Sequence, residues 1–489
     1  MKVEIGASLA ALVLVVFAVH APGARTDFSY DDFDFVVNNQ SIRSPAAAWA
    51  SFAQPFPPHL PDRGTYRPVV NLSYAIDHQL WPLDARGFHQ VNVALYAVVA
   101  GLVYALARFH DPSPGFAFAV AAVFAAHPVH CEAVDSVTGR SELLAAVFAL
   151  ISILAFARAA QRAADRHPAP GLVAISAVAY GLCAFSKEVG TVVPGVLAVY
   201  FVCYGRRPDE RAASWVRRGA LLLAPFAAVG LAYLAARRNA LGWLSPAHSM
   251  LEAKGLAFRI HTIGMSWLQY VRQLVAPATL HVDYYWDQFF QDPRRTLPWA
   301  AAGVALLGGT LAALAVAIRQ LFRAREPGSA AIALCGLSFV LVFLFPVMHV
   351  LPTLGWMSER YLFLPSIGFS LLVGLAAREA LRRFAPSARA QIAAGSALLC
   401  LAVVAGGWRS HQRAAEWRDE VLLWQVEDAA RPNDSRVLTN LAQAYARRAR
   451  FPEAWDALQR ARRADPKIPA LDRLLDALEP LLRASLGKG

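Results

Sequence analysis

Long apolar runs dominate this chain of 489 residues and limit the folds that are open to it. A helix needs roughly 20 apolar residues to cross a bilayer. The pattern therefore predicts an α-helical, polytopic membrane protein with about 11 transmembrane helices. The runs lie at residues 6–20, 89–107, 115–127, 141–158, 171–186, 189–204, 219–236, 298–318, 329–348, 361–377 and 388–406.

The first run follows Lys2 and has two interpretations. A cleaved signal peptide shares this pattern of a basic residue followed by a short apolar stretch. A retained anchor is the interpretation that we favour, because no clear cleavage site follows the run. Both interpretations deliver the next segment, residues 21–87, to the outside of the membrane.

Arginine clusters between the runs predict the orientation of the chain. If the N-terminus is inside, the clusters at 158–166, 206–218, 319–325 and 378–383 all fall on the inner side, as the positive-inside rule requires. The net charge of +12 is explained by this topology. A nucleic-acid partner is therefore not expected, and membrane lipids are the surroundings that we predict.

The segment 256–276 is only moderately apolar and carries Arg259, His261, Gln269 and Arg272. As a twelfth span it would place the later arginine clusters outside. We therefore predict an interfacial or re-entrant helix on the outer face.

The composition changes after the last run, so we divide the chain into a transmembrane domain (1–407) and an outer tail (408–489). Small and large residues between Leu438 and Ala461 follow the pattern of one tetratricopeptide repeat, which Asp465-Pro466 ends. One repeat cannot bury its own face. The tail is thus expected either to dock on the membrane domain or to be the remnant of a longer array.

A pair of acids stands at the membrane edge directly after the first run. Asp31 and Asp32 lie among aromatic residues in the outer segment 21–87. An N-cap at a turn is the simpler structural explanation, which Asp serves well. The functional interpretation is a general base, with the second acid orienting it or the acceptor.

Further charged and polar groups fall on the same predicted side of the membrane. Arginine is suited to phosphate through bidentate hydrogen bonds, and charges at membrane depth usually pair or serve a site. Two histidines followed by a carboxylate also resemble a loose metal pattern, but helix capping is the simpler explanation and no metal site is predicted. The candidate binding residues are Arg67, His127, His130, Glu132, Arg140, Lys187, Glu188, Glu359, Arg360 and Tyr361.

Seven stretches follow one another in a fixed order: Tyr30–Asp32, Tyr66–Pro68, Phe88–Asn92, Ala126–Val134, Gly139–Leu144, Ser186–Gly190 and Ser358–Ser366. In this order they resemble the motifs of the transmembrane and tetratricopeptide-repeat-containing O-mannosyltransferases, in a bacterial version. The resemblance implies the GT-C glycosyltransferase fold, a polyprenyl-phosphate sugar donor, a protein Ser or Thr acceptor, and an acid of the first outer loop as base. Unlike the eukaryotic members, this chain has little more than one repeat.

The mechanism expected from this resemblance is inverting transfer of a sugar, with mannose as the expected sugar. Asp31 or Asp32 would deprotonate the acceptor hydroxyl, while Arg67, Lys187 and Arg360 would hold the leaving polyprenyl phosphate. No cofactor is expected to be required. Scarce Met and the excess of Arg over Lys favour a bacterial origin. With the orientation predicted above, we expect an inner-membrane protein whose tail is periplasmic.

Two alternatives remain open at this point. The chain could be a non-catalytic membrane scaffold whose tail binds partner proteins, because tetratricopeptide helices usually bind peptides. It could also be a GT-C transferase that acts on a glycan or lipid acceptor.

Overall fold

The computed structural model describes residues 2–207, 210–244, 255–282, 284, 293–324, 328–350, 356–465 and 469–486. These residues form helices and short helical turns, joined by loops with one isolated β-bridge between Tyr284 and Met357. The α-helices are α1 (Lys2–His20), α2 (Pro45–Ala50), α3 (Pro68–Leu80), α4 (Ala85–His110), α5 (Pro114–Ala125), α6 (Cys131–Asp135), α7 (Arg140–Ala164), α8 (Pro170–Ser186), α9 (Val193–Tyr204), α10 (Ala212–Leu241), α11 (Leu256–Val275), α13 (Pro293–Arg323), α14 (Gly328–Leu344), α15 (Pro365–Phe384), α16 (Ala388–Glu416), α17 (Glu420–Ala430), α18 (Ser435–Arg447), α19 (Phe451–Ala464) and α20 (Pro469–Leu486).

Every apolar run of the sequence coincides with one of these helices, which confirms the all-helical, polytopic fold. Within the described residues, 6 helices are long and apolar enough to cross a membrane, or up to 7 if α5 and the bent segment after it form one broken span. The apolar helices α1, α8 and α9 are shorter, and charges fill the C-terminal half of α15. The predicted count of about 11 spans is therefore not established by helix length and composition.

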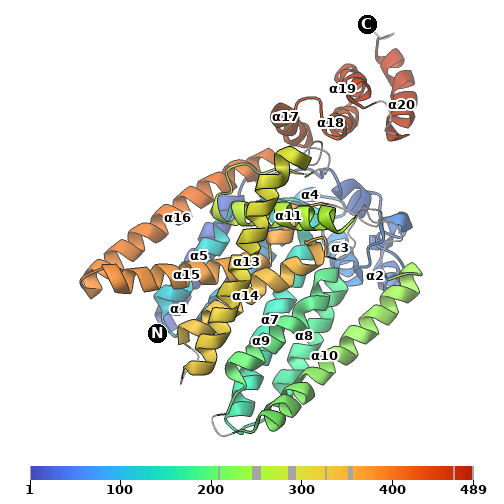
Figure 1. The fold of residues 1–489 in the computed structure, drawn as a ribbon. Helices are drawn as coiled ribbons and strands as arrows, with labels where there is room; N and C mark the ends of the chain where they lie inside the picture. The colour runs from blue at the N-terminus through green and yellow to red at the C-terminus, as the bar shows by residue number, and fades with distance from the viewer. Residues whose placement is uncertain are drawn as a thin grey trace.

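The long helices run side by side, and α11 lies across α13 near the end of the bundle that carries the tail (Figure 1). The C-terminal end of α9 and the N-terminal end of α10 lie at the opposite end (Figure 1). α11 is not among the helices that pass as spans. Its amphipathic sequence and transverse course fit the interfacial placement that the sequence predicts.

Small residues let α11 and α13 approach closely where they cross. A Cβ atom added to Gly303 of α13 would overlap the carbonyl oxygen of Gly264 on α11. Polar side chains join other helices, as in the hydrogen bond between the Ser152 and Ser176 hydroxyls of α7 and α8, at 3.0 Å. Both devices are common in helix packing within membranes, where apolar side chains gain little by contacting each other rather than lipid.

The outer segment between α1 and α4 folds against the ends of the membrane helices. Its own apolar cluster includes Phe35, Ile42, Phe56 and Tyr74, which pack with Phe88 of α4. The Tyr74 hydroxyl donates a 2.9 Å hydrogen bond to the carbonyl of Val137. These contacts hold residues 28–35, the acid-bearing stretch with Asp31 and Asp32, against the ends of the membrane helices.

The tail docks on the membrane domain through its own core. Trp424 of α17 packs with Leu438, Leu441 and Leu458, and this cluster continues onto Val282 and Tyr30. Asp434 caps α18 by accepting hydrogen bonds from the backbone N–H groups of the first turn. α16 runs without a break through the predicted domain boundary at 407/408 to Glu416. Pro466, which was predicted to end the second repeat helix, lies outside the described residues.

Candidate active site

A cavity of about 800 Å³ opens between the outer segment and the ends of α7, α8, α10 and η10 (Glu359–Leu362). Seven of the sequence-predicted site residues line this cavity. Their grouping is consistent with the expectation that outer polar groups gather at one place. They are Asp31, Arg67, Glu132, Lys187, Glu188, Arg360 and Tyr361.

The two neighbouring acids have different surroundings. The Asp31 side chain faces the cavity, is 21% exposed and lies 3.6 Å from Nη1 of Arg63. Asp32 is fully buried, and its carboxyl accepts hydrogen bonds from the backbone N–H of Ser29 (3.1 Å) and of Thr138 (2.9 Å). Burial raises the pKa of Asp32 to about 7, although these hydrogen bonds oppose the shift. Asp31 is thus the acid that an acceptor in the cavity can reach.

Glu188 holds two arginines at the cavity wall. Arg67 donates to its Oε2 from Nη2 at 3.0 Å and from Nε at 3.2 Å. Arg237 of α10 lies 3.4 Å from its Oε1 and donates to the carbonyl of Gly64 at 3.1 Å. Burial raises the pKa of Glu188, but the charges of Arg67 and Arg237 outweigh it and hold the pKa at about 2. The guanidinium groups are therefore fixed beside an ionised carboxylate.

Lys187 forms the second cation–carboxylate pair. Its ammonium contacts Glu142 at the start of α7, and both side chains are buried. It also lies 5.4 Å from the ring centre of Tyr361. Burial lowers the pKa of Lys187 well below its usual range, with the nearby arginines acting in the same direction. A negatively charged ligand at this point would favour the charged form of the lysine.

Arg360 and Glu132 form the third pair. The backbone N–H of Arg360 donates to Oε2 of Glu132 at 2.8 Å, and its guanidinium contacts Oε1. The Arg360 side chain remains 37% exposed and borders the cavity. Each cation of the cavity is thus held by a carboxylate, yet an arginine offers more donors than one carboxylate can use.

Besides Asp32, four predicted residues do not line the cavity. His127 and His130 are buried between helices, where they bond to the carbonyl of Leu274 (2.9 Å) and to the hydroxyls of Tyr96 (2.6 Å) and Ser366 (2.7 Å). These partners, and the engagement of Glu132 with Arg360, assign the two histidines to helix packing.

Arg140 and Glu359 also make internal contacts. Arg140 is fully buried and pairs with Asp77 at 2.7 Å. Glu359 accepts hydrogen bonds from the backbone N–H of His281 (2.5 Å) and from the Tyr284 hydroxyl (2.8 Å). Burial raises the pKa of Glu359 to about 8. These residues fix loops around the cavity rather than forming its wall.

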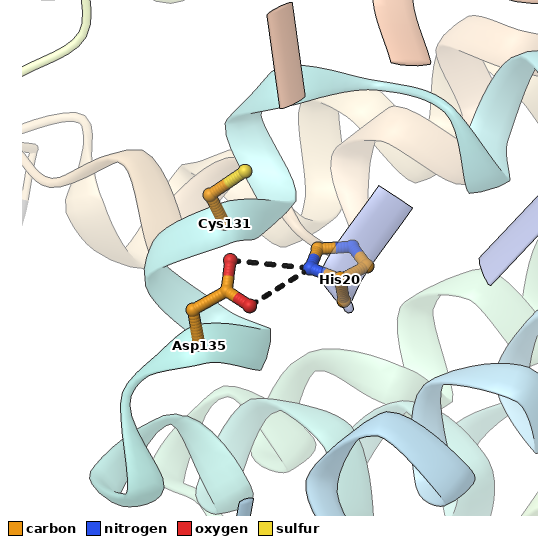
Figure 2. A group of neighbouring side chains, drawn as sticks. All are labelled: His20, Cys131 and Asp135. Carbon is orange, nitrogen blue, oxygen red and sulfur yellow. Dashed lines mark hydrogen bonds and ion pairs between the residues drawn. The ribbon is translucent and has the colours of Figure 1, made fainter. Parts of the chain in front are cut away.

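Within the described part of the chain, His20, Cys131 and Asp135 are close enough to share a metal ion. Figure 2 shows Asp135 of α6 pointing at the His20 ring, with Nδ1 of the histidine 3.0 Å from Oδ1. The Cys131 thiol donates to the carbonyl of Ser410 at 3.4 Å. All three side chains already have partners, so the cluster serves as a polar junction of α1, α6 and α16.

Several cavity residues were not among the sequence-based candidates. Glu142 lies just inside an apolar run, and Arg237 follows the predicted end of another, so neither stood out by position. Trp417 comes from the tail, which the sequence places in a separate domain. The sequence could have indicated Arg63 as a site residue, because it lies just before the family-like motif Tyr66–Pro68.

The fold and this cavity define a polytopic α-helical membrane protein with a charged site at one end of its helices. No family model matches the chain. It is similar to the protein O-mannosyl-transferase F38B6.6 of Caenorhabditis elegans, with 24% identity over 85% of this chain and 57% of the relative. It is also similar to Drosophila melanogaster Tmtc3, with 25% identity over 81% of this chain and 48% of the relative. Mouse TMTC1 matches with 33% identity over 36% of this chain and 20% of the relative.

These matches make the chain a homologue of the TMTC-type protein O-mannosyl-transferases, in agreement with the resemblance drawn from its motifs. The chain spans about half the length of the curated relatives that match most of it.

Proposed function

We propose that the chain is an inverting glycosyltransferase that moves a sugar, mannose by analogy, from a polyprenyl-phosphate carrier to a protein Ser or Thr hydroxyl. The observation that carries this proposal is the single cavity in which Asp31 lies with Arg67, Lys187 and Arg360. Homologues named as protein O-mannosyl-transferases support the reaction class and the protein acceptor. We place the cavity on the extracytoplasmic face of a bacterial inner membrane, as the arginine distribution favours.

In the proposed reaction, Asp31 takes the proton of the acceptor hydroxyl. The hydroxyl oxygen forms a bond to the anomeric carbon of the sugar from the face opposite the carrier. The bond between that carbon and the phosphate oxygen breaks, and the electron pair leaves with the polyprenyl phosphate. The charge that develops on this phosphate is stabilised by Arg67, Lys187 and Arg360, a kind of electrostatic assistance that is commonly the largest catalytic contribution.

The buried Asp32 has a supporting part in this proposal. Its hydrogen bonds to the backbone of Ser29 and Thr138 tie the acid-bearing stretch to the start of α7.

We expect Arg67, Lys187 and Arg360 to stabilise the phosphate without a divalent metal, so that transfer continues in the presence of a chelator. A fall of transfer to background with EDTA would contradict that part of the proposal.

The test is transfer from polyprenyl-phosphate mannose to an acceptor peptide by the purified protein in lipid nanodiscs. We expect Asp31→Asn to lower kcat by about 10²- to 10⁴-fold, the usual contribution of a general base. Asp62→Asn, in the same outer segment but exposed, is the matched control and should keep wild-type transfer. Full transfer by the Asp31→Asn protein would overturn the assignment. Transfer to a free glycan or lipid instead of the peptide would support the alternative acceptor class.

A further inference from the structure

The stretch that carries Asp31 is anchored on both sides. After Asp31, the carboxyl of Asp32 is held by backbone groups of Ser29 and Thr138. Before it, the backbone N–H of Tyr30 donates a 3.0 Å hydrogen bond to Oε1 of Glu420, the first residue of α17 in the tail. The position of Asp31 in the cavity thus depends on two parts of the chain, one of which is the tail.

Tyr30 has a backbone conformation that needs such support. Its φ angle is +49°, in the left-handed region that residues other than glycine seldom occupy. Strained conformations of this kind persist only where surrounding contacts enforce them. The Tyr30 ring packs edge-to-face on Trp424 of α17, with ring centres 5.1 Å apart, so the tail contacts both its side chain and its backbone.

Glu420 is itself held in place. It is 6% exposed, and Nη1 of Arg447 on α18 donates to the same Oε1 at 2.6 Å. The Arg447 guanidinium lies 4.4 Å from the ring centre of Phe33, two residues after Asp31. The Glu420–Arg447 pair therefore reaches the acid-bearing stretch on both flanks of Asp31. Trp417, just before α17, lines the cavity as well.

We propose that Glu420 is a positioning residue that, together with Arg447, holds the Tyr30 backbone and so sets the place of Asp31 in the cavity. The inference rests on the proposed function and extends it, because it makes the tail a part of the active site. A general base must lie within hydrogen-bond reach of its proton, and a displacement of about 1 Å is enough to cost up to 10²-fold in rate. Loss of the Glu420 contact would act on the chemical step rather than on binding of the lipid carrier.

The experiment compares Glu420→Ala and Glu420→Gln with the wild type in the nanodisc transfer assay. Alanine removes the acceptor of the Tyr30 N–H, and we expect kcat to fall by about 10- to 100-fold while the KM for the donor stays unchanged. Glutamine still offers an oxygen to that N–H and should restore kcat to within about threefold of the wild type, because only the charge on the acceptor is lost. Glu479→Ala, which removes an ion pair with Arg483 in α20, is the matched control and should leave kcat unchanged.

A second measurement is independent of activity. Amide hydrogen exchange of the peptide 28–35 should become faster in the Glu420→Ala protein and stay unchanged in the Glu479→Ala protein, because only the first loses an anchor of this stretch. Unchanged exchange, or a wild-type kcat in Glu420→Ala, would overturn the inference. A kcat as low in Glu420→Gln as in Glu420→Ala would also overturn it, because the carboxylate charge and not the position of Tyr30 would then be required.

The two proposals fail in distinguishable ways. If Asp31→Asn abolishes transfer and Glu420→Ala does not, the proposed function stands and the positioning role falls. If the wild type transfers no sugar, the proposed function falls, and the exchange of peptide 28–35 still decides whether Glu420 holds this stretch.

Discussion

Asp31 and Asp32 are adjacent in sequence, yet one faces a cavity and the other is enclosed by backbone N–H groups. The same division applies to the cations. Arg67 and Arg360 border the cavity, whereas Arg140 is fully buried against Asp77. Side-chain direction at this scale decides which groups are available to a substrate and which maintain the loops that carry them.

Asp32 provides a prediction on pH and stability. Its pKa is about 7 in the folded protein and about 3.9 in an unfolded chain, so the folded state binds this proton more tightly. The resulting stabilisation is complete below the unfolded pKa and is lost as the pH rises through about 7. A shift of this size corresponds to at most about 4 kcal/mol. The contribution of Asp32 to the free energy of unfolding should therefore fall between pH 5 and pH 8.

The matched measurement uses Asp32→Asn, which cannot ionise. We expect the difference in unfolding temperature between wild type and Asp32→Asn to shrink from pH 5 to pH 8. Asp62→Asn, in which an exposed acid is replaced, should follow the wild type at every pH. A constant difference between wild type and Asp32→Asn would show that Asp32 keeps an ordinary pKa in the folded protein.

The sequence predicted which charged residues lie near one another better than it predicted their individual contacts. Lys187, Glu188 and Arg360 were found because charges between apolar runs on one side of a membrane must converge there. Glu359 met the same criterion but points toward His281 and Tyr284, and nothing in a charge pattern reveals that direction. Arg237 was missed because helix α10 continues beyond its apolar run, which brings one more turn to the cavity.

At the scale of the elements, the sequence predicted the helices, but it did not predict which of them are buried within the protein. α7 and α16 are equally long apolar runs in the sequence, yet 83% of the apolar window of α7 is buried within the protein and 0% of that of α16. Periodicity could not distinguish them, because lipid and a protein interior are both apolar surroundings. α11 was recognised as different because charged residues interrupt its apolar sequence.

The crossing of α11 and α13 gives a prediction with a control on the same helix. A Cβ at Gly303 would overlap the backbone of Gly264, whereas a Cβ at Gly308 meets no atom within 4 Å. Gly303→Ala should therefore force the helices apart and lower the unfolding temperature. Gly308→Ala should leave it unchanged or raise it slightly, because alanine favours a helix over glycine by about 1 kcal/mol. Equal unfolding temperatures for the two variants would rule out this close crossing.

At the scale of the whole molecule, the cavity is lined by residues that range in sequence from Tyr30 to Trp417. The outer segment, the ends of several membrane helices and the tail meet at one end of the bundle, and the C-terminal end of α9 and the N-terminal end of α10 lie at the other (Figure 1). Because the tail contacts Tyr30, the two must be on the same side of any membrane that the helices cross.

Labelling with a membrane-impermeant maleimide tests this arrangement in intact cells. In a background without the native cysteines, we expect Asp62→Cys and Arg463→Cys to react from outside. Arg211→Cys, at the start of α10, should react only after the membrane is opened. External labelling at position 211, or protection at position 62, would invert the orientation that the arginines predict.

The hydrogen bond between Tyr30 and Glu420 joins residues 390 positions apart. At a synthesis rate of roughly 5–20 residues per second, a growing chain would carry its outer acids for roughly 20–80 s before the glutamate that steadies them is made. A ribosome-bound precursor would thus hold Asp31, the proposed base, without the contact from the tail. Under the proposed function, completion of the chain would raise the rate of transfer, and a translation product that stopped after α16 would lack the contact that positions Asp31.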